Sequence, residues 1–215
     1  MKPALRRVLP AVAAVLAFSA LSVATASAAA PEFKVAGGKF PTTFTGTSEA
    51  VHIETPGGGY TCSSSSISGE ITGPKEVSKV VIKFGSKGGC SSFCIQTGHE
   101  GWETKEMKGA IGYLSQKEGT KVGLLLEPTT EPVANCTRGA NGANTKIIGS
   151  VIGELGPLHE QRKAFNLEYA KSGSIQEFRS FEGEEVIHDL RPSLSPQGAI
   201  EAKMSLTTAK EVEIS

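Results

Sequence analysis

Alternation of apolar and polar residues with a period of two is the feature that most constrains this chain. Four separate runs show it, and their apolar members are Val80, Ile82 and Phe84; Val122, Leu124 and Leu126; Phe165, Leu167 and Tyr169; and Ile200, Ala202, Met204 and Leu206. Successive side chains of a strand point to opposite faces, so each run predicts a strand with one buried face. The sequence shows no long stretch of apolar residues at helical spacing. The chain is therefore predicted to be all-β.

Short polar connections between these runs indicate how the strands pair. Residues 116–119 and 158–162 have the length of hairpin loops, and the first ends in Gly119, a residue suited to a positive φ. One strand is expected over residues 146–155 and the next over 163–169. Strands joined so closely pair antiparallel, because a parallel crossover needs about a dozen residues or more. The prediction is an antiparallel meander that closes into a barrel or folds into a two-sheet sandwich.

Four glycines lie inside these strand-like runs, at Gly109, Gly112, Gly149 and Gly153. Glycine weakens the interior of a strand, and it often marks a bulge, a bend or a close approach of another backbone. Their positions suit a strongly coiled sheet such as the wall of a barrel.

The first 28 residues have the three parts of an export signal. Lys2, Arg6 and Arg7 form a positive segment, residues 8–26 are apolar or small, and Ala26-Ser27-Ala28 offers a cleavage site. We expect export by the Sec route and cleavage after Ala28, which leaves residues 29–215 as one all-β domain without a membrane span. An uncleaved membrane anchor is the alternative. It is disfavoured because polar residues interrupt a run that is marginal for the ~20 apolar residues of a span.

The predicted mature chain is close to neutral. The full sequence has 22 basic and 22 acidic residues, and removal of the signal takes away three basic and no acidic residues, which leaves 19 against 22. A small negative charge without clustered Lys and Arg is not the footprint of a nucleic-acid-binding protein. We expect no nucleic-acid partner.

All four cysteines, Cys62, Cys90, Cys94 and Cys136, lie after the predicted signal. An even number of cysteines in an exported protein predicts disulfides, and four cysteines allow three connectivities. We favour a local bridge between Cys90 and Cys94, which bracket a glycine-rich loop, and a long-range bridge between Cys62 and Cys136. A zinc site is the weaker alternative, because the sequence has no C-x-x-C pair.

Several glycine-containing segments also resemble those of a known group of proteins. They are residues 68–74 (SGEITGP), 108–114 (KGAIGYL), 122–126 (VGLLL) and 149–153 (GSVIG). Together they resemble a family of exported, uncharacterised all-β proteins of high-GC Gram-positive soil bacteria. The resemblance covers the chain from about Tyr60 onward, and it implies secretion and a β fold. It implies no activity and no site residues.

Catalytic and metal-binding patterns are weak in this sequence. It has no G-x-S-x-G elbow, and its only aspartate, Asp189, adjoins His188, whose side chain would point to the opposite face of a strand. The four histidines lack the i, i+4 spacing of a metal-binding pair, and there is no acidic calcium loop. We therefore expect no metal and no cofactor.

The most site-like cluster is formed by His99, Glu100, Trp102 and Glu103. An aromatic ring with polar groups nearby could hold a sugar or another flat ligand. The alternative interpretation is a surface loop that the tryptophan anchors to the core.

Two functions remain open on these observations. The first is a non-catalytic secreted or cell-surface β module that binds a ligand or a cell-envelope component through its barrel mouth or its loops, the longest of which are residues 85–103 and 129–144. The second is a secreted hydrolase or isomerase that uses His99, Glu100 and Glu103, which would have to converge in one pocket with perturbed pKa values.

Overall fold

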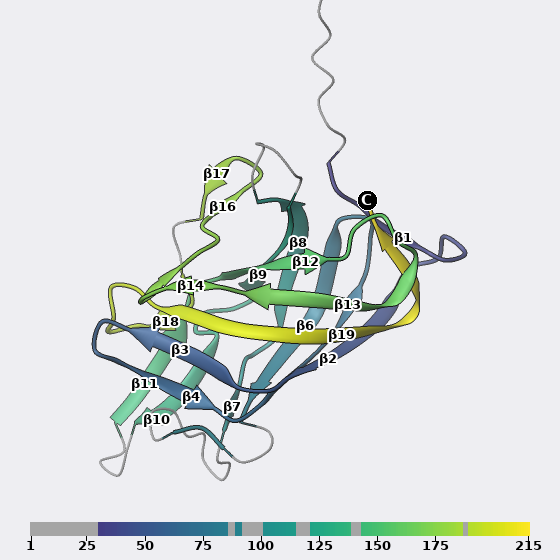
Figure 1. Cartoon of the computed structure of the whole chain (residues 1–215). Helices are drawn as coiled ribbons and strands as arrows, with labels where there is room; N and C mark the ends of the chain where they lie inside the picture. The colour runs from purple at the N-terminus through teal and green to yellow at the C-terminus, as the bar shows by residue number, and fades with distance from the viewer. Residues whose placement is uncertain (1–29, 86–88, 92–100, 115–120, 139–142, 187–188) are drawn as a thin grey trace, which may run out of the picture.

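Eight antiparallel strands close into a barrel in the computed structural model, which describes residues 30–85, 89–91, 101–114, 121–138, 143–186 and 189–215 (Figure 1). The strands of the wall are β2 (Thr42–Ser48), β5 (Ser65–Ile71), β6 (Glu76–Phe84), β8 (Met107–Tyr113), β9 (Val122–Pro128), β12 (Val151–Gly156), β13 (Arg162–Tyr169) and β19 (Ala199–Ile214). Each wall strand pairs with the next along the chain, and the pairing of β19 with β2 closes the ring. The predicted all-β meander is confirmed, and it forms the barrel of the two predicted architectures.

Shorter strands precede the first wall strand or occupy the connections between the wall strands. They are β1 (Phe33–Val35), β3 (Val51–Thr55), β4 (Gly58–Cys62), β7 (Trp102–Glu103), β10 (Ala134–Arg138), β11 (Ala143–Ile148), β14 (Lys171–Ser172), β15 (Ile175–Gln176), β16 (Ser180–Phe181), β17 (Glu184–Glu185) and β18 (Arg191–Pro192). The β3–β4 hairpin continues the pairing of β2 with β5 and also pairs with the start of β19. Strands β10, β11 and β18 form a separate three-stranded sheet.

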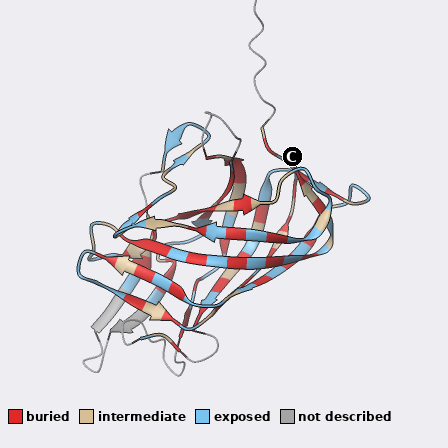
Figure 2. Ribbon diagram, viewed as in Figure 1, coloured by how far each residue is buried: buried red, intermediate tan, exposed pale blue. Residues whose placement is uncertain are grey.

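The predicted alternation is clearest in β13 and β19, whereas in β9 Gly123 is buried together with its neighbours. Buried and exposed residues form alternating bands along β13 and β19 (Figure 2). Every apolar residue of the four runs named from the sequence is buried. The buried members fill the barrel, and most of the residues between them are exposed to solvent or half-buried.

The strand expected over residues 146–155 is in fact two strands in different sheets. Strand β11 ends at Ile148 and pairs with β10, whereas β12 begins at Val151 and pairs with β9. Gly149 lies between them with a φ of 99°. Glycine adopts this conformation without the steric cost that a side chain brings, so the chain turns there from one sheet into the other.

Gly109 is the site of a close backbone approach, as the sequence predicted. A Cβ atom at this position would lie 2.3 Å from the carbonyl oxygen of Leu125 on the neighbouring strand. Because backbone cannot move aside as a side chain can, we expect Gly109→Ala to destabilise the protein by about 1–3 kcal/mol. Chemical denaturation measures this change.

Gly57→Ala is the matched control for that substitution. The nearest atom to a Cβ there is the Thr55 Oγ1 atom at 3.9 Å, so we expect little change or a stabilisation below about 1 kcal/mol. Equal effects of the two substitutions would contradict the explanation from close approach at Gly109.

The disulfide pairing favoured from the sequence is wrong. Cys62 is bonded to Cys90, so neither is free for the predicted bridges to Cys136 and Cys94. The backbone next to the bridge explains the pairing: residues 89–91 lie alongside β4, where Ser63 N–H donates to Gly89 O at 3.0 Å and Ser91 N–H donates to Thr61 O at 2.8 Å. Cys94 and the side chain of Cys136 lie outside the described part of the chain.

The predicted export signal also lies outside the described residues, which begin at Ala30. Among the described residues, no helix has the length and apolar character needed to cross a membrane.

Candidate functional site

The cluster predicted around Trp102 is divided between the core and the surface. Trp102 is 2% exposed, and its ring stacks on that of Phe84 with 4.2 Å between the ring centroids. Glu103 follows on the same short strand, points to the opposite side, and forms an ion pair with Lys83 at 3.1 Å. His99 and Glu100 lie outside the described residues. The structure therefore does not bring Trp102 and Glu103 together, and the tryptophan serves as a core anchor.

A small apolar cavity lies among core side chains inside the barrel. It has a volume of about 20 Å³ and lies between side chains that include Phe33, Phe44, Phe165 and Leu206. That is room for about one water molecule. This cavity is too small to hold a ligand, and binding at the barrel mouth stays a prediction.

Burial raises the pKa of one carboxyl group and two phenols among the described residues. Desolvation raises the pKa of Asp189, and the nearby Arg179 and Arg191 oppose that rise. The Arg179 Nε atom lies 3.7 Å from an Asp189 carboxylate oxygen. Burial also raises the pKa values of Tyr60 and Tyr169, so both phenols stay neutral. Within the described residues there is no group of three or more potential metal ligands.

A set of six hydroxyl side chains on the outer wall is the most distinctive polar surface. It consists of Thr45 and Thr47 on β2, Ser66 and Ser68 on β5, and Ser205 and Thr207 on β19, and we call it the hydroxyl face. The strand register aligns these residues in two rows across the three strands. One row is Thr207–Thr45–Ser68, and the other is Ser205–Thr47–Ser66.

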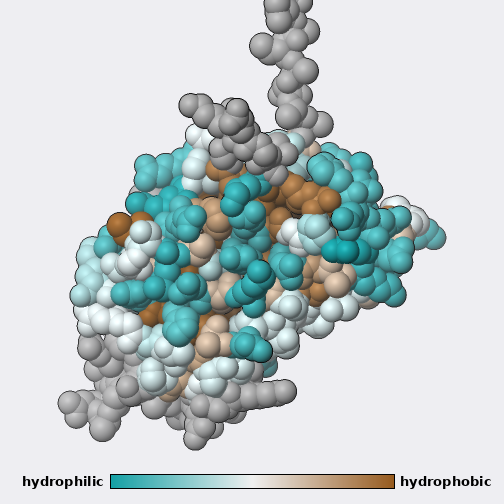
Figure 3. Space-filling model, in the orientation of Figure 1, coloured by the Kyte–Doolittle hydropathy of each residue, from teal (hydrophilic) through white to brown (hydrophobic). Residues whose placement is uncertain are grey.

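The hydroxyl face is hollowed rather than convex. A shallow hollow of about 420 Å³ includes all six of its residues in its lining. A second hollow of about 690 Å³ adjoins the first, because Thr47 and Ser205 line both. Pale atoms of intermediate hydropathy gather below the centre of Figure 3, over β2 and the middle of β19, whereas the teal of hydrophilic side chains covers much of β13. The two hollows therefore form one continuous shallow depression, lined by hydroxyl groups together with apolar atoms.

The six hydroxyl groups are available for a ligand. None of them forms a hydrogen bond with another residue in the described part of the chain. Elsewhere on the wall, outward positions carry charged ion pairs such as Lys121–Glu154 at 2.7 Å. Threonine is favoured in strands for its shape alone, but that preference does not account for the three serines.

Two ion pairs border the hydroxyl face, one from β6 and one from β19. Lys83 forms its pair with Glu103 at 3.1 Å, and Lys203 forms one with Glu168 at 3.4 Å. Both lysines line the hollows, so their charges are compensated where a ligand would lie. The residue set is close to neutral and rich in groups that both donate and accept hydrogen bonds.

Gly46 holds the strands of the hydroxyl face close together. It lies between Thr45 and Thr47 and is buried. A Cβ atom there would lie 2.4 Å from Leu206 Cδ2 and 3.0 Å from Ile67 Cγ2. Without a side chain at Gly46, these two residues pack directly beneath β2, and this packing brings β19 and β5 against it on both sides.

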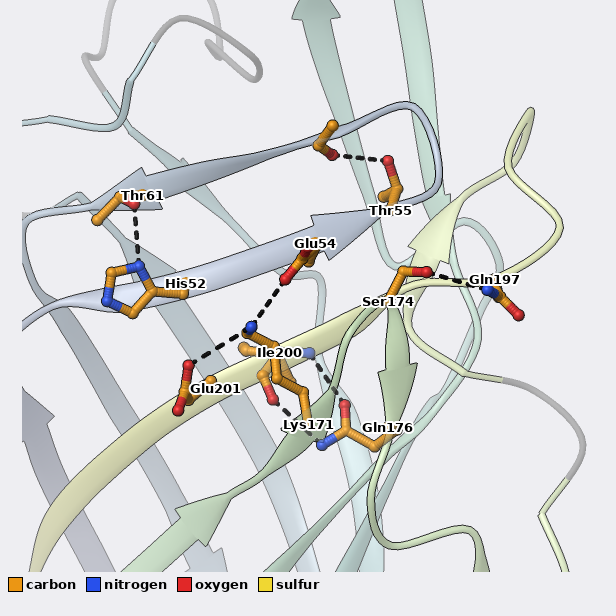
Figure 4. A network of polar contacts seen from close by, with 11 residues as sticks. His52, Glu54, Thr55, Thr61, Lys171, Ser174, Gln176, Gln197, Ile200 and Glu201 are labelled. Carbon is orange, nitrogen blue, oxygen red and sulfur yellow. Dashed lines mark hydrogen bonds and ion pairs between the residues drawn. The ribbon is translucent and has the colours of Figure 1, made fainter.

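A second polar network braces the other end of β19 (Figure 4). The buried Gln176 accepts a hydrogen bond from Ile200 N–H at 3.0 Å and donates to Ile200 O at 3.2 Å and Ala170 O at 2.8 Å. Lys171 Nζ lies 2.7 Å from a Glu54 carboxylate oxygen and 3.7 Å from one of Glu201, and the hydrogen bond with Glu54 is the main cause of the raised pKa of Lys171. These side chains already satisfy one another, so the network fixes the β14–β15 hairpin on β19.

Sequence reasoning overlooked the hydroxyl face, although a signal for it was present. Each of its strands contains two hydroxyl residues separated by one residue: Thr45-Gly46-Thr47, Ser66-Ile67-Ser68 and Ser205-Leu206-Thr207. In a strand, such a triplet places both hydroxyl groups on the same face.

Comparisons with known proteins give this chain no family and no relative. No protein-family model matches it, and searches of the curated proteins and of the solved structures found no match. The argument for its function therefore depends on its own residues.

Proposed function

We propose that this protein is an exported, non-catalytic binding module whose ligand lies on the hydroxyl face of the barrel. The observation that carries this proposal is the register, which places six unpartnered hydroxyl groups in two aligned rows within one hollow. Loops and strand faces held by a rigid scaffold are common binding surfaces, and a closed barrel is such a scaffold. Among the surfaces that the described residues form, the hydroxyl face is the one we propose for the ligand.

Two observations support export. Residues 1–28 carry the three parts of an export signal. Cys62 and Cys90 form a disulfide, and disulfides persist mainly in oxidising compartments. Export would bring the protein to the cell envelope, so we take a cell-envelope component as the target to test first.

The chemistry of the hydroxyl face supports binding rather than catalysis. Its six residues are alcohols, which are weak nucleophiles unless a neighbouring base activates them. The lysines at its border, Lys83 and Lys203, are held in ion pairs. Hydroxyl groups in this arrangement are suited to a polar ligand that they hold by hydrogen bonds.

Cosedimentation of the protein with purified Gram-positive cell walls tests the proposal. The protein is collected from the culture medium, where N-terminal sequencing is expected to begin at Ala29. We expect it to sediment with the walls. Thr47→Arg is expected to weaken this binding at least about tenfold, or about 1.4 kcal/mol, because Thr47 lines both hollows and the longer side chain fills them.

Asn135→Arg is the control for that experiment. Asn135 is also an exposed, neutral strand residue, but it lies on β10 in the separate three-stranded sheet. We expect this variant to bind as the unchanged protein does. Binding that survives Thr47→Arg, or no binding by the unchanged protein, would count against the proposal.

A further inference from the structure

We infer that the ligand of the hydroxyl face is an uncharged polysaccharide chain that lies across the strands. This inference rests on the proposed function, because it names the class of molecule that would occupy the same surface. Three properties of the face support it: the type of hydrogen-bonding group, the balance of charge, and the length of the polar row.

The hydrogen-bonding groups of the face match those of a sugar. Each serine or threonine hydroxyl can donate one hydrogen bond and accept others, as each sugar hydroxyl does. A ligand with only acceptors, such as a phosphate polymer, would use half of this capacity and would favour cationic partners. Six unpartnered hydroxyl groups side by side therefore favour a ligand that itself carries many hydroxyl groups.

The charges around the face disfavour an anionic polymer. Both lysines that line the hollows are paired, Lys83 with Glu103 and Lys203 with Glu168. The remaining charged residue in the lining is Glu49, which would repel an anion. A polyanion would have to break these pairs and approach a carboxylate, whereas an uncharged chain would do neither.

One of the two rows stays polar across five adjacent strands, which indicates the direction in which a polysaccharide chain would lie. The row Ser205–Thr47–Ser66 continues in register to Asn166 on β13 and to Lys83 on β6. These five polar positions on adjacent strands cover about 19 Å, because neighbouring strands lie about 4.8 Å apart. The other row, Thr207–Thr45–Ser68, meets an apolar residue at each end, Ala164 on β13 and Val81 on β6. A chain placed along the first row thus meets a polar group on every strand it crosses.

The lining also determines how such a chain would be held. None of the described residues that line the two hollows is aromatic. Without a ring on which a sugar could stack, binding would depend on many individually weak hydrogen bonds. We therefore expect affinity to increase with chain length until the ligand covers the whole row.

Affinity electrophoresis of the full exported protein tests the inference. The gels contain a neutral polysaccharide (dextran, mannan, xylan or mixed-linkage β-glucan) or an anionic one (polygalacturonate or a teichoic acid). We expect at least one neutral polymer to retard the protein and the anionic polymers to leave it unaffected. Thr47→Val removes one hydroxyl group at nearly constant shape and should weaken the retardation about 2- to 10-fold.

Thr43→Val is the matched control, since Thr43 lies on the same strand, faces outward and lines neither hollow. It should leave the retardation unchanged. The inference would be overturned if only anionic polymers retarded the protein, or if no polymer did. It would also be overturned if Thr47→Val were retarded as much as the unchanged protein. Wall binding that is sensitive to Thr47→Arg, combined with retardation by teichoic acid only, would refute the inference and leave the proposed function standing.

Discussion

Replacement of Trp102 by alanine is expected to destabilise the protein by about 3–5 kcal/mol, the usual cost of removing a large buried aromatic side chain. Trp102 is 2% exposed and stacks on Phe84. It also lies in a strand of two residues, β7, which pairs with the end of β6. The loss combines the lost burial of the ring with the cavity that remains beside Phe84. Denaturant unfolding of the variant measures it.

Glu103→Gln is the comparison for Trp102→Ala. The Glu103–Lys83 pair is exposed to solvent, and such pairs contribute between about 0 and 1 kcal/mol. The two neighbours should therefore differ severalfold in their effect on the free energy of unfolding. A loss below about 1 kcal/mol for Trp102→Ala would contradict the assignment of this residue to the core and would revive the ligand-binding cluster predicted from the sequence.

Removal of the Cys62–Cys90 bridge is the second substitution with a large expected effect. The two cysteines are 28 residues apart, and on the chain-entropy model a loop of this length makes the bridge worth about 3–4 kcal/mol. Cys62→Ala combined with Cys90→Ala removes both thiols and avoids new pairings. We expect its free energy of unfolding to fall by that amount under non-reducing conditions. A fall below about 1 kcal/mol would show that the bridge contributes little to stability.

Peptide mapping without reduction tests the connectivity itself. The bond between Cys62 and Cys90 uses two of the four cysteines, so Cys94 and Cys136 are the two left for a further intramolecular bridge. We expect one peptide pair for each bridge. A peptide that joins Cys90 to Cys94 would contradict the structure.

Much of the fold was predictable from the sequence because its main signal is local. Alternation in β13 and β19 indicates which residues are buried whatever the strands pair with, since the pleat of a single strand sets the period. Short connections likewise predicted the antiparallel pairing of β8 with β9 and of β12 with β13. These predictions needed no knowledge of distant contacts.

The predictions that failed concern contacts between side chains, which closeness along the sequence does not determine. Cys90 lies four residues from Cys94, but its bonded partner is Cys62, because residues 89–91 run beside β4. Trp102 and Glu103 are adjacent in a segment that suggested a site, but the strand formed by β7 directs them to opposite sides. In both cases proximity along the chain did not predict proximity between side chains.

The hydroxyl face shows most directly what the sequence determined and what the tertiary structure determined. The sequence by itself determined that Thr45 and Thr47, Ser66 and Ser68, and Ser205 and Thr207 form three pairs, each on one face of its own strand. Only the tertiary structure decided that the three pairs lie side by side. Strands β2 and β19 come from opposite ends of the domain, and their register depends on barrel closure and on the packing of Leu206 and Ile67 beneath Gly46. Because a shift of one residue turns every side chain to the other face, that packing both fills the core and aligns the outer hydroxyl groups.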